Sequence, residues 1–98
     1  MRVRARKDSN HVEIVKAFRD MGASVLDTAQ LGKGAPDCFV AMNKQCVAVE
    51  IKDGAKPPSA RKLTPDEATF HDEWRGWIEI VCNVDDVVKL VNRIRGGK

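Results

Sequence analysis

The stretch Pro36–Lys52, with the sequence PDCFVAMNKQCVAVEIK, contains two short runs rich in apolar and β-branched residues. The runs Cys38–Met42 and Cys46–Ile51 are separated by Asn43-Lys44-Gln45, whose composition is typical of a turn. Two such runs joined by so short a connection predict an antiparallel β-hairpin. The hairpin determines which side chains of the two strands face one another.

The register of this hairpin follows from the position of its turn. If the turn is symmetric, Met42 pairs with Gln45, and five steps back along each strand place Asp37 opposite Glu50. Directly opposed residues have Cβ atoms ~4.5–5.5 Å apart. Lys44 is an unusual residue for the positive φ that a two-residue turn requires, so a bulge that shifts the register by one residue is the alternative.

Charged side chains occupy one face of the second strand. Because side chains alternate along a strand, Glu50 and Lys52 point to one side, and Val49 and Ile51 point to the other. Two opposed carboxylates destabilise a sheet unless one is protonated or a cation lies between them. A hard divalent cation, Mg²⁺ or Mn²⁺, is the simplest remedy, because it prefers carboxylate, carbonyl and water oxygens.

Such an ion would polarise a phosphate oxygen and lower the pKa of its bound water, while a nearby lysine stabilises the charge of the transition state. Asp37, Glu50 and Lys52 therefore form a candidate centre for phosphodiester hydrolysis. In the alternative interpretation, Asp37 caps the preceding turn, and the other two are solvent-side residues of an edge strand. That alternative suits an isolated Glu-x-Lys, which is a common tripeptide, better than it suits this combination of segments.

Helical and strand patterns flank the hairpin. Before the hairpin they predict a helix over Asn10–Met21, a strand over Ala23–Asp27 and a loop over Gln30–Pro36. After the hairpin they predict a helix that begins with the capping box Thr64–Glu67, a strand over Trp77–Cys82 and a final helix capped by Asn83 or Asp85. Ala55–Leu63 is too polar and proline-rich for an element. The order α-β-β-β-α-β-α predicts an α/β fold, a mixed central sheet flanked by helices.

Length and composition favour one small domain. The 98 residues, 43% hydrophobic and 32% charged, suit a single globular domain over 1–98, with a basic arm at 1–8 and a frayed tail at 95–98. Cys38, Cys46 and Cys82 lack the spacing of a zinc site and are expected to be reduced and buried. No apolar run approaches the ~18 residues of a membrane span and no secretory signal is visible, so we expect a cytoplasmic protein without a membrane partner.

Basic residues cluster although the net charge is only +3. Three groups suit contacts with nucleic-acid phosphates: Arg2, Arg4, Arg6 and Lys7 at the start, Lys33 in the loop, and Lys56, Arg61 and Lys62 after the hairpin. The alternative is a solvated terminus and an ordinary polar loop.

The combination of motifs resembles a known family of nucleases. Gly34-Ala35-Pro36-Asp37, followed after twelve residues by Glu50-Ile51-Lys52, resembles the PD-(D/E)XK signature of the restriction-endonuclease-like fold. Leu63-Thr64-Pro65-Asp66-Glu67 with Phe70-His71 looks like the VRR-NUC branch, the virus-type replication-repair nucleases. The resemblance covers roughly Asn10 to Cys82 and is closest to a minimal stand-alone member of the kind that bacteriophages encode.

The resemblance implies specific roles for these residues. Asp37, Glu50 and the carbonyl of Ile51 would bind Mg²⁺ or Mn²⁺, and Lys52 would be the catalytic lysine. It also implies an acid on the first helix, for which Glu13 is the match. On its own, Glu13 can equally be explained as a partner of the positive helix N-terminus.

Two residues of the second helix are possible accessory residues. Glu67 stands where many family members carry glutamine, and its place in the capping box explains it without catalysis. His71 lies one turn further along the same face, although a lone helix histidine is more often a surface residue.

The resemblance further implies DNA as the substrate, preferably branched, flapped or Holliday-junction-like, with a homodimeric enzyme that needs no organic cofactor. Val25, Trp77 and the last helix offer apolar surface for a dimer. The alternatives are a catalytically silent nucleic-acid-binding or assembly module on the same fold, and an accessory subunit whose partner selects the substrate.

Overall fold

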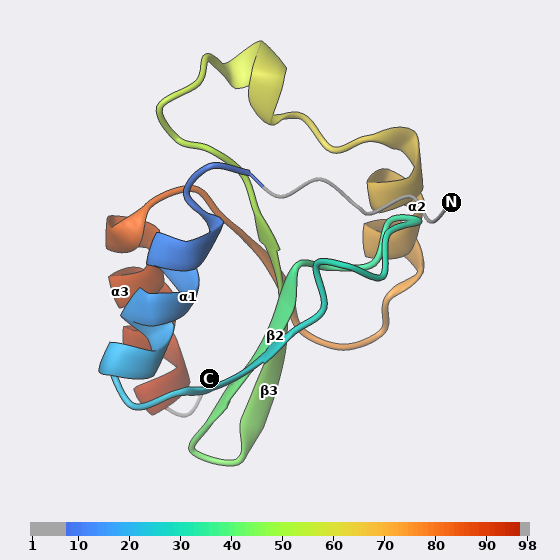
Figure 1. The fold of residues 1–98 in the computed structure, drawn as a ribbon. Helices are drawn as coiled ribbons and strands as arrows, with labels where there is room; N and C mark the ends of the chain where they lie inside the picture. Colours follow the sequence, from blue (N-terminus) through green and yellow to red (C-terminus); the bar gives the residue numbers. More distant parts are fainter. Residues whose placement is uncertain (1–7, 97–98) are drawn as a thin grey trace.

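The computed structural model describes residues 8–96, and it has the element order that the sequence predicts (Figure 1). The elements are α1 (His11–Asp20), β1 (Ser24–Asp27), β2 (Cys38–Met42), β3 (Gln45–Ile51), the 3₁₀ helix η1 (Pro58–Arg61), α2 (Pro65–Glu73), β4 (Ile78–Val81) and α3 (Val84–Arg95). The short helix η1 is the one element that was not expected; Pro58 at its first position suits a helix start because proline has no N–H to satisfy there.

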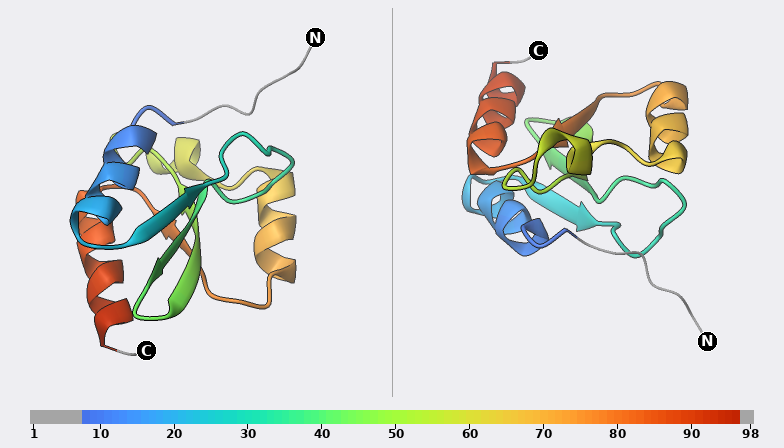
Figure 2. Two further views of the ribbon diagram at one scale, coloured as in Figure 1. Left: turned by 60° about the horizontal axis from the view of Figure 1, so that its bottom comes forward. Right: turned by 90° about the horizontal axis from the view of Figure 1, so that it is seen from above.

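The four strands form one mixed sheet in the order β1-β2-β3-β4. The first three strands pair antiparallel, whereas β4 runs parallel to β3, because α2 carries the chain back across the sheet between them. Helices α1 and α3 pack side by side on one face, and α2 lies on the opposite side of the sheet (Figure 2). The predicted mixed sheet flanked by helices is confirmed.

The hydrophobic core lies between the sheet and the pair α1 and α3. Alternate strand residues point into it, including Val47, Val49 and Ile51 of β3, each with no exposed surface. The helices contribute apolar residues at helical spacing: Ile14, Val15 and Phe18 from α1, and Val87, Leu90, Val91 and Ile94 from α3. The residues of β3 between them, Glu50 among others, therefore face the second side of the sheet, as predicted.

The hairpin has the predicted register. Met42 pairs with Gln45 and Cys38 with Val49, so the next step places Asp37 opposite Glu50. The two turn residues Asn43 and Lys44 have φ of 53° and 62°, the left-handed conformation of a type I′ turn, whose twist matches that of the strands. Lys44 therefore adopts a conformation that its side chain disfavours, and the bulge is not formed.

Side chains cap two of the helices as the sequence predicts. Thr64 and Glu67 form both halves of the capping box at the start of α2, and Asn83 caps α3 by accepting a hydrogen bond from the amide of Asp86. Asn10 precedes α1 but does not cap it with its side chain. Its amide instead donates to the carbonyls of Lys52 and Cys82, 3.1 Å and 3.0 Å away, which ties α1 to the ends of β3 and β4.

Two expectations at the level of single residues are wrong. Cys38 is buried, and burial raises the pKa of its thiol to about 12, but Cys82 is half-buried and Cys46 is exposed on the second face of the sheet. Arg95 belongs to α3 and donates a hydrogen bond to the carbonyl of Met21, so the structure shows no frayed tail at this residue. Within residues 8–96 no helix is long and apolar enough to cross a membrane.

The positive φ of Lys44 in the hairpin turn predicts how substitutions at this residue change the stability of the protein. Lys44→Gly should raise the free energy of unfolding by about 1 kcal/mol, because glycine adopts positive φ without the steric cost that a side chain imposes. Lys44→Ala removes the same long side chain but keeps the cost, and is the matched control. Urea unfolding of both variants measures the effect; equal stabilities for the glycine and alanine variants would show that the turn stores no strain.

Candidate active site

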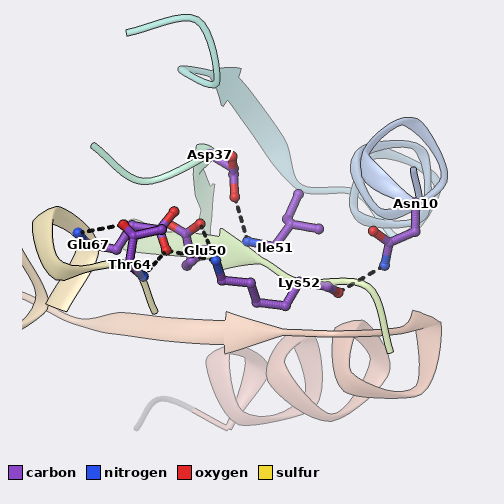
Figure 3. Close-up of polar contacts among 7 residues, drawn as sticks. All are labelled: Asn10, Asp37, Glu50, Ile51, Lys52, Thr64 and Glu67. Atoms are coloured by element: carbon purple, nitrogen blue, oxygen red, sulfur yellow. Dashed lines mark hydrogen bonds and ion pairs between the residues drawn. The ribbon is translucent and has the colours of Figure 1, made fainter. Parts of the chain in front are cut away.

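Three of the predicted site residues meet on the second face of the sheet. Asp37 directly precedes β2, Glu50 lies in β3 and Lys52 directly follows it, so the hairpin and one strand end hold all three. Glu50 and Lys52 are only 2% and 8% exposed, unusual values for charged residue types. Both side chains point toward the start of α2 (Figure 3). The proximity that the hairpin register predicted is confirmed in the structure.

The carboxylate of Asp37 is fixed against β3. Its Oδ2 accepts a hydrogen bond from the amide of Ile51 at 2.7 Å, and its backbone carbonyl accepts one from the amide of Thr28 at 2.9 Å. Burial raises the pKa of this carboxyl above its usual value, although the hydrogen bonds act in the opposite direction. Asp37 is thus held at one orientation beside the Glu50 carboxyl.

Glu50 is the most perturbed carboxyl of the site. Burial, and after it the neighbouring Asp37 carboxyl, raises its pKa to about 10. Its buried Oε1 has no hydrogen-bond partner among the residues that the structure describes. A buried polar atom without a partner is costly, so this position favours either a proton or a cation at neutral pH.

Lys52 is held between two carboxyl groups. Its Nζ lies 2.7 Å from Oε1 of Glu67 and 3.9 Å from Oε2 of Glu50. Burial alone would lower the pKa of this lysine, but the hydrogen bond and the charge of Glu67 outweigh burial and raise it. Lys52 is therefore cationic at neutral pH.

Glu67 serves α2 and the site with the same oxygen. Its Oε1 accepts hydrogen bonds from Nζ of Lys52 and, at 2.9 Å, from the amide of Thr64 in the capping box. Burial would raise the pKa of Glu67, but Lys52 and the Thr64 amide outweigh it and lower the pKa. Glu67 therefore both caps α2 and contacts Lys52 of the site.

A pocket of about 500 Å³ opens beside these side chains. Its charged and hydroxyl-bearing lining residues are Asp8, Lys33, Asp37, Glu50, Lys52, Thr64, Asp66 and Glu67. The sequence patterns place Asp8 only at the end of the basic arm over residues 1–8, with no role in the site. The path of the chain past the end of β3 brings Asp8 to the pocket, and no local sequence signal reveals that path.

Glu13 is not brought to this pocket. It is exposed on α1 and lines a separate pocket with Asp53 and Asp85. His71 is half-buried on α2, and burial lowers its pKa. Its buried Nε2 has no hydrogen-bond partner within residues 8–96.

The predicted basic residues divide into three groups. Lys33 is exposed, lines the pocket and has φ of 55°. The residues Lys56, Arg61 and Lys62 lie on and beside η1, the first and last of them exposed, and do not line the pocket. Arg2, Arg4, Arg6 and Lys7 lie outside the residues that the structure describes.

The donor set fits a hard divalent cation held by few protein ligands. No group of three or more His, Cys, Asp or Glu side chains in the described part of the chain is arranged to hold a metal ion. Mg²⁺ commonly takes only one or two protein carboxylates and keeps several waters. The fixed carboxylate of Asp37 and the unpartnered Oε1 of Glu50 meet that requirement.

The raised pKa of Glu50 predicts how stability changes with pH in the absence of metal. The unfolded chain releases this proton near pH 4.5, whereas the folded state keeps it up to about pH 10. Between these values the folded state binds more protons, so the stability of the protein falls as pH rises. The pKa of Asp37 is also raised, so its ionisation likewise lowers the stability as pH rises. Glu50→Gln should therefore be more stable than the parent, by a margin that widens from pH 5 to pH 9.

Thermal unfolding in EDTA across this pH range measures that margin. Glu13→Gln is the matched control, because Glu13 is an exposed carboxyl on α1 and its curve should follow the parent. A constant difference between Glu50→Gln and the parent at all pH values would show that Glu50 does not retain its proton.

The comparisons with known proteins concern the fold. No protein-family model matches the chain, and no curated protein matches it. Among solved structures the chain is similar to a VRR_NUC domain, with a TM-score of 0.63 and 23% sequence identity over 87% of this chain and 97% of that one. At this identity the likeness establishes the fold, and the fold that the sequence resemblance implied is confirmed: the chain has the fold of a VRR_NUC domain.

Proposed function

We propose that this protein is a Mg²⁺- or Mn²⁺-dependent deoxyribonuclease that hydrolyses phosphodiester bonds at the pocket between the hairpin and α2. One observation carries the proposal: buried Glu50 has an unpartnered oxygen beside the fixed carboxylate of Asp37, with the Lys52 cation 3.9 Å away. A purely structural role would not require a carboxyl group and a lysine at buried positions of so small a domain, next to a second carboxyl group.

Asp37, Glu50 and the carbonyl of Ile51 would hold the divalent ion. When bound there, the ion supplies Lewis acidity toward a phosphate oxygen and a more acidic water. The hydrogen bond from the Ile51 amide keeps the Asp37 carboxylate in one orientation beside Glu50. Because the paired carboxyl groups repel each other when both are ionised, the site favours a cation electrostatically.

Lys52 would stabilise the negative charge that develops on the phosphate during hydrolysis. Glu67 positions this lysine and keeps it protonated, and its own orientation is set by the Thr64 amide. Asp8 brings a further carboxylate to the pocket, where it can accept a hydrogen bond from the attacking water. His71 is a possible accessory residue one turn beyond Glu67.

DNA is the proposed substrate, and the basic residues would contact its phosphates. Lys33 at the pocket, the group at and around η1, and the basic N-terminal arm would bind on either side of the cut. The resemblance to VRR-NUC nucleases favours branched or flapped DNA and a homodimer, for which the half-exposed Val88 of α3 provides apolar surface.

Single substitutions at the centre should abolish cleavage and leave the fold intact. Asp37→Asn, Glu50→Gln and Lys52→Ala should each lower the rate by ~10²-fold or more, because each removes an electrostatic contribution to the transition state. The measurement is cleavage of supercoiled, single-stranded, flapped and four-way-junction DNA in Mg²⁺, Mn²⁺ or EDTA, with DNA binding measured in parallel.

Two further variants decide which acid near α1 takes part. Asp8→Asn should lower the rate if the acid of the pocket is Asp8, and Glu13→Gln should do so if the implied helix acid acts instead. Near-wild-type cleavage by a variant at Asp37, Glu50 or Lys52 would remove that residue from the site. DNA binding without cleavage under all metal conditions would identify a silent binding module.

A further inference from the structure

Aromatic side chains gather beside the proposed active site rather than in the core. The chain has only 3 Phe and 2 Trp, and of these Phe18 alone is fully buried, in the core between the sheet and the helices α1 and α3. Phe39, Phe70 and Trp74 meet on the other side of the sheet. The rings of Phe70 and Trp74 are stacked with centroids 5.2 Å apart, and Phe39 contacts Trp74 at 5.8 Å.

Two separate elements place these rings next to the site residues. On β2, Phe39 follows Asp37 by two residues and so lies on the same face of the sheet. On α2, Glu67 and Phe70 are three residues apart and so lie on one helix face. Trp74 is the C-cap residue that directly follows α2, and its ring stacks on that of Phe70. Seven residues of helix span ~10 Å, so the backbone of Trp74 lies about that far along the helix axis from the backbone of Glu67, the residue that contacts Lys52.

Trp74 keeps substantial exposed surface in this cluster. Its side chain is 39% exposed, although Phe70 stacks on it and a Cβ at Gly76 would lie 2.9 Å from its Nε1. The exposed charged residues next to Trp74 are the acids Asp72 and Glu73 and the base Arg75. The two acids disfavour a phosphate near them, whereas none of the three charges disfavours an uncharged aromatic group at Trp74.

We propose that Trp74, supported by Phe70, is a platform on which an unpaired base of the DNA strand stacks. With ~3.4 Å per stacked nucleotide, the platform lies within about three nucleotides of the phosphate at Lys52. A base inside a duplex already stacks on both faces, whereas a base in a single strand or flap has a face to offer. The inference rests on the proposed nuclease function and names its substrate class: DNA with unpaired nucleotides next to the cut.

The cluster also attaches α2 to the sheet through the contact of Trp74 with Phe39. Any large apolar side chain can fill that packing role, whereas base stacking requires a flat ring. Trp74→Leu and Trp74→Phe therefore separate the two roles. The leucine variant keeps apolar contact with Phe39 and loses the stacking surface, and the phenylalanine variant keeps both.

Binding of single-stranded oligonucleotides with one abasic position tests the platform directly. Glu50→Gln is the background, because it is expected to prevent cleavage and preserves the shape of the side chain. In this background, an abasic position within about three nucleotides of the site should weaken binding about tenfold, the effect of one base stack. With Trp74→Leu added, all oligonucleotides should bind equally and about as weakly as the abasic one. With Trp74→Phe added, the dependence on the base should remain.

Fluorescence gives a second measurement that packing alone would not change. Trp77 packs against the core and its Nε1 donates to Glu79, so Trp77→Phe leaves Trp74 as the single tryptophan signal. The intact oligonucleotide should quench this signal, and the oligonucleotide abasic at the sensitive position should not. An abasic dependence that Trp74→Leu leaves unchanged would overturn the proposal, and so would an absence of single-strand binding or of quenching.

The failure of this proposal can be told apart from failure of the nuclease function. Wild type that cuts no DNA would refute the function, and the platform would still be judged by binding and quenching alone. If the wild type cuts single-stranded and duplex DNA, and Trp74→Leu cuts both substrates as fast as the wild type, the platform alone would be refuted. A change of oligomeric state in Trp74→Leu without a change in DNA binding would identify the aromatic surface as a contact between copies of the chain.

Discussion

Two carboxyl groups at neighbouring, largely buried positions are the constraint on which the rest of this structure depends. The hairpin register brings Asp37 opposite Glu50, and the sheet and α2 exclude water from Glu50. Two ionised carboxylates cannot share such a place without compensation. The Ile51 amide and Lys52 supply part of this compensation, and one oxygen of Glu50 has no partner among residues 8–96. A nucleic-acid phosphate that approaches Glu50 would therefore come next to the Lys52 cation and to the two carboxyl groups that favour a bound metal ion.

The position of α2 depends on the same charges. No residue of α2 is buried, so this helix is not held by a core of its own in the way that α1 and α3 are. It is held by the ion pair between Glu67 and Lys52, by the ring of Trp74 on Phe39, and by the close approach of Gly34 to the carbonyl of Asp66. A side chain at Gly34 would clash there, with a Cβ 2.3 Å from that oxygen. The loop before β2, the end of β3 and the start of α2 therefore form one connected wall of the pocket.

The parts of this architecture that local patterns encode could be predicted from the sequence. Alternation along β3 assigned Glu50 and Val49 to opposite faces, and the two-residue turn set the register, because both follow from the period of a strand. The capping box located the start of α2, because its two residues stand at a fixed spacing at the N-terminus of a helix. The contact between Lys52 and Glu67 could not be derived in this way, because it depends on how α2 is placed across the sheet. Asp8 and Glu13 show the same limit: each is an acid near the start of α1, and only the path of the chain past β3 decides which one faces the pocket.

The central claim is that Asp37 and Glu50 together bind a divalent metal ion. Calorimetric titration of Mg²⁺ and Mn²⁺ into the wild-type protein, and into the Asp37→Asn/Glu50→Gln double variant, tests it most directly. The account predicts saturable uptake by the wild type and none by the double variant, whose fold should persist because both substitutions preserve the shape of the side chains. Equal metal uptake by the two proteins would contradict the account, since the ion would then be bound elsewhere on the chain.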